Sequence, residues 1–285
     1  MTDYGKAALY MLISALSFAF MSVFVKLAGP LPVWEKVFFR NLISLLISGW
    51  SIYATHQSFL GQKENRWFLS GRAITGLVGM ILYFYALDKM LLADVNMLVS
   101  FSPFFVTLLA WAFLNEKLNK VQVPALFVVF ASSLLIIKPR FDWSVLPALM
   151  AFIASMTTGV SHTIVRKLGK KENPDTIIFY FSLLSTIVIF PIMMVHFVSP
   201  TSLQWLYLFL TGIFAAIGQY GLTYAYRYGK ASEVTVFNFS GIVFSVLLGY
   251  FIWGELSDAY SIAGGTVILL MSVYIFYYNN KNHTS

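Results

Sequence analysis

The most informative stretch of the chain is residues 79–116, GMILYFYALDKMLLADVNMLVSFSPFFVTLLAWAFLNE. Their pattern returns 139 positions later, in residues 218–255, as GQYGLTYAYRYGKASEVTVFNFSGIVFSVLLGYFIWGE. Eight of the 38 aligned positions are identical, among them the closing glutamates Glu116 and Glu255. We interpret these two glutamates as structural residues at equivalent helix ends. The chain therefore contains two related halves, which we expect at 1–140 and 141–285.

The composition is that of a protein embedded in lipid. Of its 285 residues, 59% are hydrophobic and only 11% are charged, whereas soluble proteins carry about 25% charged residues. The apolar residues stand in runs of about 20, the length that crosses a bilayer as a helix, and these runs lack the alternation of a barrel strand. We therefore expect an all-α membrane protein with ten transmembrane helices, at 6–27, 34–54, 68–87, 92–114, 121–138, 145–166, 176–197, 203–227, 233–254 and 260–278.

The charge distribution predicts that both termini are cytoplasmic. In that orientation, 13 of the 19 Lys and Arg residues lie in inside segments and 6 in outside segments, as expected because positive residues resist translocation. We attribute the net charge of +7 to these loops, not to nucleic-acid binding. Five spans per half insert the second half upside down, so we expect two inverted five-helix repeats, as in secondary transporters with a site near the midplane.

Other classes of function have little support in the sequence. The absence of cysteine excludes disulfides, thiolate metal sites and cysteine nucleophiles. No P-loop motif, metal-spaced cluster of His and acids, or repeated channel filter occurs. We expect no enzymatic activity, no cofactor and no metal. An intramembrane enzyme and a non-transporting membrane scaffold are the alternatives from other classes.

Several segments are similar to one known family. They are PVWEKVFFRN (32–41), FYALDKMLLADVNMLVSFSPFF (84–105), FLNEKL (113–118), AYRYGKASEVTVFNFSGIVFS (225–245), IWGEL (252–256) and IAGGTVILLMSVYI (262–275). With them the chain resembles the ten-span EamA branch of the drug/metabolite transporter superfamily. The resemblance implies an alternating-access carrier for small organic solutes, often an exporter of amino acids or related metabolites. Four-span relatives exchange protons for cationic drugs through an acid in their first span, but here no acid occurs between Asp3 and Glu35.

Two interrupted spans point to the binding site. Pro103 and Gly241 lie near the middle of the fourth and ninth predicted spans, and such interruptions at matching depths loosen backbone that can contact a substrate. A packing kink is the alternative interpretation. Asn96 and Ser100 share a helical face with Pro103, and the ninth span has Asn238 and Gly241 at a corresponding spacing. Because an amide in hydrocarbon needs partners or a wet cavity, we expect these residues to bind substrate.

Polar residues of other spans complete the candidate site. Arg40 lies roughly 10 Å inside the second predicted span, and a guanidinium there can hold a carboxylate with two parallel hydrogen bonds. His162 lies within the sixth span and can bind substrate or titrate near neutral pH. The remaining candidates are Ser17 in the first span and Gln219 and Tyr220 in the eighth.

Arg40 and the absence of a deep carboxylate favour a zwitterionic or anionic small-molecule substrate. A carrier of organic cations or drugs, held by tyrosines and tryptophans, is the alternative. The lipid bilayer is the second expected partner, and a coupling proton or an exchanged solute stays open. A compact body without cysteine is typical of the bacterial cytoplasmic (inner) membrane. We therefore expect a bacterial inner-membrane transporter.

Overall fold

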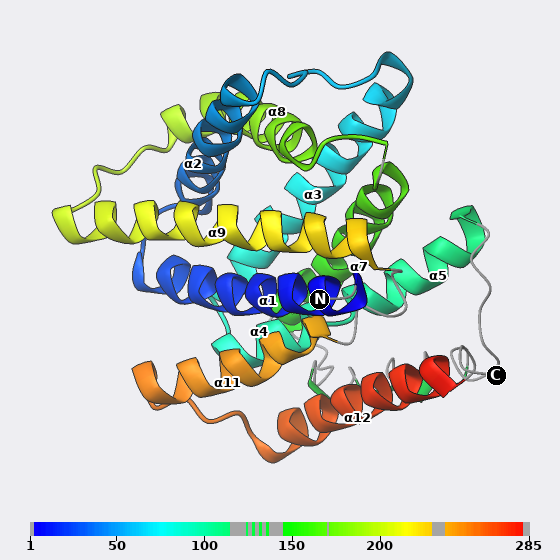
Figure 1. Ribbon diagram of the computed structural model, residues 1–285. Coiled ribbons are helices and arrows are strands. Elements are labelled where there is room, and N and C mark those ends of the chain that lie inside the picture. The colour runs from blue at the N-terminus through cyan, green and yellow to red at the C-terminus, as the bar shows by residue number, and fades with distance from the viewer. Residues whose placement is uncertain are drawn as a thin grey trace.

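The described part of the chain is built from helices (Figure 1). The computed structural model describes residues 3–114, 124, 127–128, 131–132, 135–136, 145–169, 171–229 and 237–281. These residues contain no strand, and their helices are α1 (Asp3–Leu27), α2 (Val33–Ala54), η1 (Lys63–Asn65), α3 (Arg66–Leu87), α4 (Leu92–Val99), α5 (Ser102–Leu114), α7 (Leu146–Leu168), α8 (Pro174–Val195), α9 (Ser202–Tyr228), α11 (Ser240–Trp253) and α12 (Ala259–Lys281). The predicted all-α class is confirmed for this part of the chain.

Seven helical segments among the described residues are long and apolar enough to cross a membrane. They are Asp3–Leu27, Val33–Ala54, Lys63–Leu87, Leu92–Phe113, Leu146–Leu168, Pro174–Val195 and Ser202–Tyr228, and each coincides with a predicted span. Two shorter apolar helices, Ser240–Trp253 and Ala259–Met271, fall in the ninth and tenth predicted spans. The fifth predicted span, 121–138, lies mostly outside the described residues, as does the predicted boundary at 140/141.

The fourth predicted span is two helices, not one. α4 and α5 are separated by a turn that begins at Ser100, and Pro103 lies in the first turn of α5, where its missing N–H interrupts no helical hydrogen bond. In the second half, a turn at Phe239 precedes α11, and Gly241 lies in the first turn of that helix. Phe239 is the residue 139 positions after Ser100. Both halves are therefore interrupted at equivalent positions, just before the residues that the sequence indicated.

The main contacts between a helix of the first half and a helix of the second half each have an equivalent contact elsewhere, in which the two halves exchange roles. α1 packs on α9 and α3 packs on α7, while α2 contacts α9 as α3 contacts α8. Likewise α1 contacts α11 and α5 contacts α7, and the equivalent helices α2 and α8 contact each other. Figure 1 shows α1 and α9 side by side, running in opposite directions. The core is therefore an interface between the halves, not two separate bundles.

Small residues let α1 and α9 approach closely. The Ser14 hydroxyl on α1 donates to the carbonyl oxygen of Gly218 on α9 at 2.7 Å. A Cβ added at Gly221 would lie 2.7 Å from the carbonyl oxygen of Tyr10, so only glycine allows this separation. Small residues at such contacts are typical of helix packing in membranes, where lipid removes the hydrophobic drive for association.

One end of the helix bundle, which we call the Lys36 end, is held by ion pairs. Lys36 Nζ on α2 lies 2.6 Å from Asp88 Oδ1, which directly follows α3. Lys26 at the end of α1 pairs with Glu255, which follows α11. Glu255 Oε2 also accepts a hydrogen bond from the backbone N–H of Leu92 at 3.0 Å. Glu255 therefore caps α4 rather than the helix that follows it, and its sequence equivalent, residue 116, lies outside the described residues.

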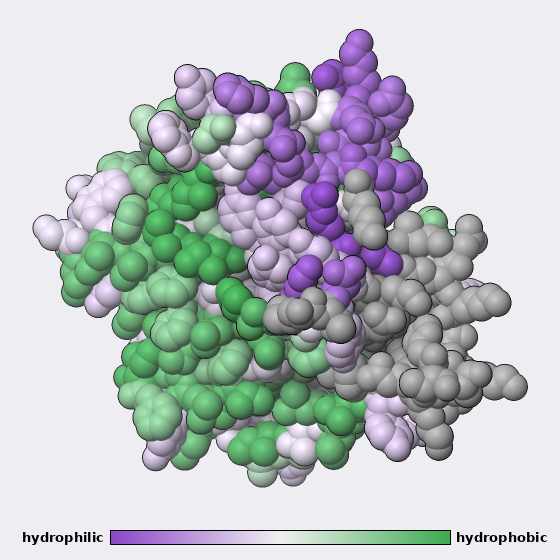
Figure 2. All heavy atoms as spheres, in the orientation of Figure 1, coloured by the Kyte–Doolittle hydropathy of each residue, from purple (hydrophilic) through white to green (hydrophobic). Residues whose placement is uncertain are grey.

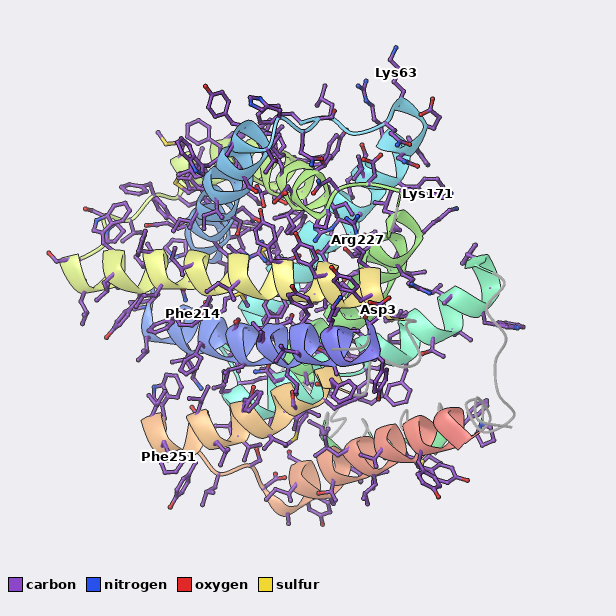
Figure 3. All side chains as sticks on the ribbon, in the orientation of Figure 1. Asp3, Lys63, Lys171, Phe214, Arg227 and Phe251 are labelled. Atoms are coloured by element: carbon purple, nitrogen blue, oxygen red, sulfur yellow. The ribbon has the colours of Figure 1, made fainter. Side chains whose placement is uncertain are left out.

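The opposite end, which we call the Lys63 end, is the more hydrophilic one. Glu172, between α7 and α8, accepts hydrogen bonds from the backbone N–H of Gln62 at 2.9 Å and from Asn65 Nδ2 at 2.7 Å. Figure 2 shows hydrophilic residues gathered over this region. In Figure 3, Lys63, Lys171, Arg227 and Asp3 lie toward one side of the molecule and Phe214 and Phe251 toward the other. The two ends therefore differ in polarity.

Candidate functional site

A central cavity lies at the interface between the two halves. The cavity has a volume of about 150 Å³. Its wall is formed by residues of α1, α2, α3, α4, α5, α7, α8, α9 and α11. Its polar lining consists of Arg40, Arg72, Tyr83, Asn96, Ser100, Ser102, Thr158, Ser161, His162, Gln219, Asn238 and Ser245. The rest of the wall is apolar or glycine. A concave, mostly apolar site with a few convergent polar groups is the form that small-molecule sites take.

The structure brings seven of the ten predicted site residues together in this cavity. They are Arg40, Asn96, Ser100, His162, Gln219, Asn238 and Gly241. They come from five helices, α2, α4, α7, α9 and α11, or from residues beside them, and they are separated by up to 201 positions in the chain. The fold therefore brings together in one cavity residues that are mostly polar, and polar side chains are costly on a lipid-exposed helix face.

Three predicted residues do not line the cavity. Ser17 is buried on α1 and Pro103 is buried in the first turn of α5. The Tyr220 hydroxyl donates to Asp175 Oδ1 at the start of α8, at 2.6 Å. Tyr220 therefore connects α9 to α8, and the cavity is lined instead by its neighbour Gln219.

Two buried arginines are the main electrostatic feature of the cavity. Arg40 and Arg72 are each only 2% exposed. Their guanidinium carbons lie 5.3 and 3.8 Å from the centroid of the Phe181 ring, distances at which a cation is attracted to an aromatic face. Arg40 Nη1 donates to Asn41 Oδ1 at 2.8 Å, and Arg72 Nη2 donates to Gln219 Oε1 at 2.7 Å.

Neither arginine has a carboxylate partner among the residues that the structure describes. The ion pairs between two described residues are those of Lys6, Lys26 and Lys36, and no Asp or Glu lines the described cavity wall. Arg40 Nε and both Nε and Nη1 of Arg72 are buried without a hydrogen-bond partner. Buried charges are normally paired because desolvation is costly. The arrangement can therefore bind an anion.

A hydrogen-bonded group of neutral residues forms another part of the wall. The Tyr83 hydroxyl donates to Asn96 Oδ1 at 2.7 Å, and the Ser22 hydroxyl lies 2.5 Å from the Tyr83 oxygen. Asn96 Nδ2 donates to the carbonyl of Leu92 one turn earlier, at 2.8 Å. Asn96 is thus held in one orientation at the cavity surface, as the need of an amide for partners requires.

Arg72, Tyr83 and Phe181 are functional candidates that the sequence reasoning missed. Arg72 is one of the 13 basic residues that the predicted orientation assigns to inside segments, yet it lies within the predicted span 68–87. That position is the same signal that singled out Arg40, so the sequence could have identified it. Tyr83 and Phe181 carried no such signal, because aromatic residues make up 18% of the chain.

The described residues offer no site for a metal ion. They contain no group of three or more His, Asp or Glu side chains that could hold one. His162 lies against the Tyr226 ring, with the ring centroids 6.0 Å apart. The cavity therefore provides cationic and neutral hydrogen-bonding groups on an aromatic and aliphatic wall.

Comparisons with known proteins place this architecture in a class of membrane transporters. The sequence model of the EamA-like transporter family matches twice, over residues 5–138 and 145–278. The chain is 31% identical over 265 residues to the pseudopaline exporter CntI of Pseudomonas aeruginosa strain UCBPP-PA14, and the match covers 92% of each chain. The chain belongs to the EamA-like transporter family.

A human solute carrier is also similar in sequence, and a solved structure shares the fold. Solute carrier family 35 member G1 of Homo sapiens is 26% identical over 287 residues, which cover 94% of this chain and 78% of the relative. A solved crystal structure superposes with a TM-score of 0.74 at 16% identity and covers 99% of both chains. The protein is therefore a membrane-embedded transporter of small molecules with a two-repeat fold, and it is not an enzyme.

Proposed function

We propose that this protein is a ten-span secondary carrier that exports a small carboxylate-bearing metabolite, an amino acid or a related compound, by alternating access. The observation that carries the proposal is the pair of buried arginines, Arg40 and Arg72, at a cavity whose described wall holds no carboxylate. A guanidinium matches a carboxylate with two parallel hydrogen bonds. The chain's own groups leave that pairing capacity unused.

The same pair of charges argues against an organic cation. A cation in the cavity would have two guanidinium groups nearby and no described carboxylate to offset them, and like charges in a low-dielectric site repel strongly. The aromatic face of Phe181, which could attract a cation, is already next to both arginines. The predicted alternative of an organic-cation carrier therefore has less support than the anion carrier.

The direction of transport and the membrane orientation rest on two further observations. The relative with 31% identity is an exporter, which supports export here. Lys63, Lys171 and Arg227 lie toward one side of the molecule (Figure 3), and positive residues are enriched on the cytoplasmic side of membrane proteins. We therefore assign the Lys63 end and both termini to the cytoplasm of a bacterial inner membrane.

Transport assays with purified protein in liposomes test the proposed function. We expect counterflow of radiolabelled L-alanine or L-glutamate and none of choline, and we expect Arg40→Gln and Arg72→Gln to abolish it. Lys63→Gln removes an equal charge from an exposed residue outside the cavity and should keep full activity. Choline counterflow, or undiminished amino-acid counterflow in both arginine variants, would overturn the proposal.

Cysteine labelling tests the orientation separately. Because the chain has no cysteine, Lys63→Cys and Ser202→Cys each introduce a single exposed thiol, at the start of η1 and of α9 respectively. A membrane-impermeant maleimide added to intact cells should label the cysteine at 202 and leave that at 63 unlabelled until the cells are opened. The reverse pattern would show that the assignment is wrong.

A further inference from the structure

We propose that the substrate of the central cavity carries two carboxylates, one for each buried arginine. This inference rests on the proposed function and narrows its substrate class from carboxylate-bearing metabolites to dicarboxylates. The observation behind it is that Arg40 and Arg72 face one cavity from adjacent helices, and that both leave donor groups unused.

The two guanidinium groups are close enough to hold one small molecule. Both lie near the same ring, Phe181, at 5.3 and 3.8 Å from its centroid, so their carbons are at most about 9 Å apart, the sum of the two distances. Arg40 comes from α2 and Arg72 from α3. A short diacid between them can direct one carboxylate to each side chain, whereas a single carboxylate can neutralise only one charge.

Both arginines have N–H groups without a protein partner in the described part of the chain, as a ligand with two carboxylates requires. Arg72 donates to Gln219 through Nη2 alone, and its Nε and Nη1 are buried without a partner. Arg40 donates to Asn41 through Nη1, and its Nε has no partner. Each arginine is therefore fixed by one neutral amide and retains further N–H groups for a ligand. Asn41 and Gln219 orient the guanidinium groups without neutralising them.

Gly76 lets α3 pack closely around the Arg72 side chain. A Cβ added at Gly76 would lie 3.0 Å from both the Phe181 ring and the Ser161 hydroxyl, and 3.3 Å from Arg72 Nη1. Any side chain at this position would therefore displace the guanidinium group or the groups packed beside it. Glycine at position 76 thus keeps Arg72 in place at the cavity wall, which both residues line.

Charge balance distinguishes a dianion from a monoanion. The described cavity wall carries two arginines and no carboxylate. A monoanion leaves one buried guanidinium uncompensated, and an unpaired buried charge is costly. A dianion compensates both. The site should therefore prefer a dicarboxylate to the same molecule with one carboxylate masked, because both compounds have nearly the same shape and differ by one charge.

A matched series of ligands tests this inference on the purified full-length protein. Succinate, its monomethyl ester and succinamide carry two, one and no charges, and ligand-induced shifts in melting temperature give their affinities. At constant ionic strength, we expect wild-type protein to bind succinate at least about tenfold more tightly than the monoester, the factor that corresponds to 1.4 kcal/mol. Succinamide should not bind.

Variants assign the preference to the two arginines. In Arg40→Gln and in Arg72→Gln, the ratio of the affinities for succinate and for the monoester should fall toward one. Arg40→Lys and Arg72→Lys keep the charge and should retain a preference for succinate, although weaker, because a lysine lacks the planar fork. Lys63→Gln should leave the ratio unchanged. If a Gln variant does not fold, the ligand series on wild-type protein and the Lys variants still decide.

The outcomes separate this inference from the proposed function. Equal affinity for succinate and its monoester in wild-type protein overturns the two-carboxylate inference, even if amino acids are transported. A shift with inorganic phosphate and none with succinate also overturns it, because the two charges would then belong to one group. If succinate binds with the expected ratio but no carboxylate is transported, the proposed transport function fails while the ligand class stands.

Discussion

The buried ion pair at the Lys36 end allows a quantitative test of what holds the structure together. The Lys36 side chain is 0% exposed and that of Asp88 is 21% exposed, with 2.6 Å between the charged atoms. Asp88→Asn would remove the charged partner of the ammonium group, which would keep its hydrogen bond to the carbonyl oxygen of Gly29 at 2.8 Å. Removing one partner of a buried pair costs about 3–5 kcal/mol, and the partial exposure of Asp88 favours the lower value, about 3 kcal/mol.

The free energy of unfolding in detergent, measured by denaturant titration, checks this value. The exposed pair of Lys6 and Asp3, at 3.7 Å and with side chains 42% and 71% exposed, supplies the control, because Asp3→Asn should cost less than about 0.5 kcal/mol. Adding Lys36→Met to Asp88→Asn removes the orphaned charge and should recover stability to within about 1 kcal/mol of wild type. The reasoning is refuted if Asp88→Asn costs no more than Asp3→Asn.

Three further changes probe the packing, the cavity wall and the Lys63 end. Gly221→Ala should lower the free energy of unfolding by about 1–3 kcal/mol, because the new Cβ would lie 2.7 Å from the Tyr10 carbonyl oxygen and force α1 from α9; an unchanged melting curve would contradict this. Tyr83→Phe removes the hydrogen bond to Asn96 and should weaken substrate binding by about 1 kcal/mol with little change in melting temperature, whereas unaltered affinity would exclude Tyr83 from the site. Glu172→Gln weakens its bond to the backbone N–H of Gln62 and should speed hydrogen exchange in residues 55–62, and an unchanged exchange rate would show that Glu172 does not hold this loop.

The sequence predicted the helices well because lipid leaves few alternatives. A backbone in hydrocarbon must satisfy its own hydrogen bonds, so a run such as 6–27 can only be a helix, and α1 spans Asp3–Leu27. The sequence did not locate the turn at Ser100, because hydropathy averages over 92–114 without registering a break. Pro103 indicated the region, but a proline is tolerated in a first turn, so the break lies before it.

The sequence could identify those site residues whose charged or strongly polar side chains are costly in lipid. It did not predict the aromatic ones. Arg40, Asn96 and His162 are expensive in hydrocarbon, and all three line the cavity. Tyr220 is amphipathic and can face several environments, so its sequence position could not show that it donates to Asp175 instead. Phe181 became a candidate only when the fold placed its ring beside two arginines.

The internal repeat also relates the contacts that close the two ends. Glu172, in the connection before α8, accepts a hydrogen bond from Gln62 in the loop between α2 and α3. Glu35, at the start of α2, accepts one from the backbone N–H of Val198, in the loop between α8 and α9, at 3.2 Å. A carboxylate of each half thus holds the equivalent loop of the other half, at opposite ends of α2. The alternating access that we propose requires that one end can open while the other stays closed, and two separate contacts at opposite ends meet that requirement. The ion pairs of Lys26 and Lys36 add to the contact at the Lys36 end, and the hydrogen bonds from Asn65 Nδ2 to Glu172 and from the Thr176 hydroxyl to the Ser58 carbonyl add to the contact at the Lys63 end.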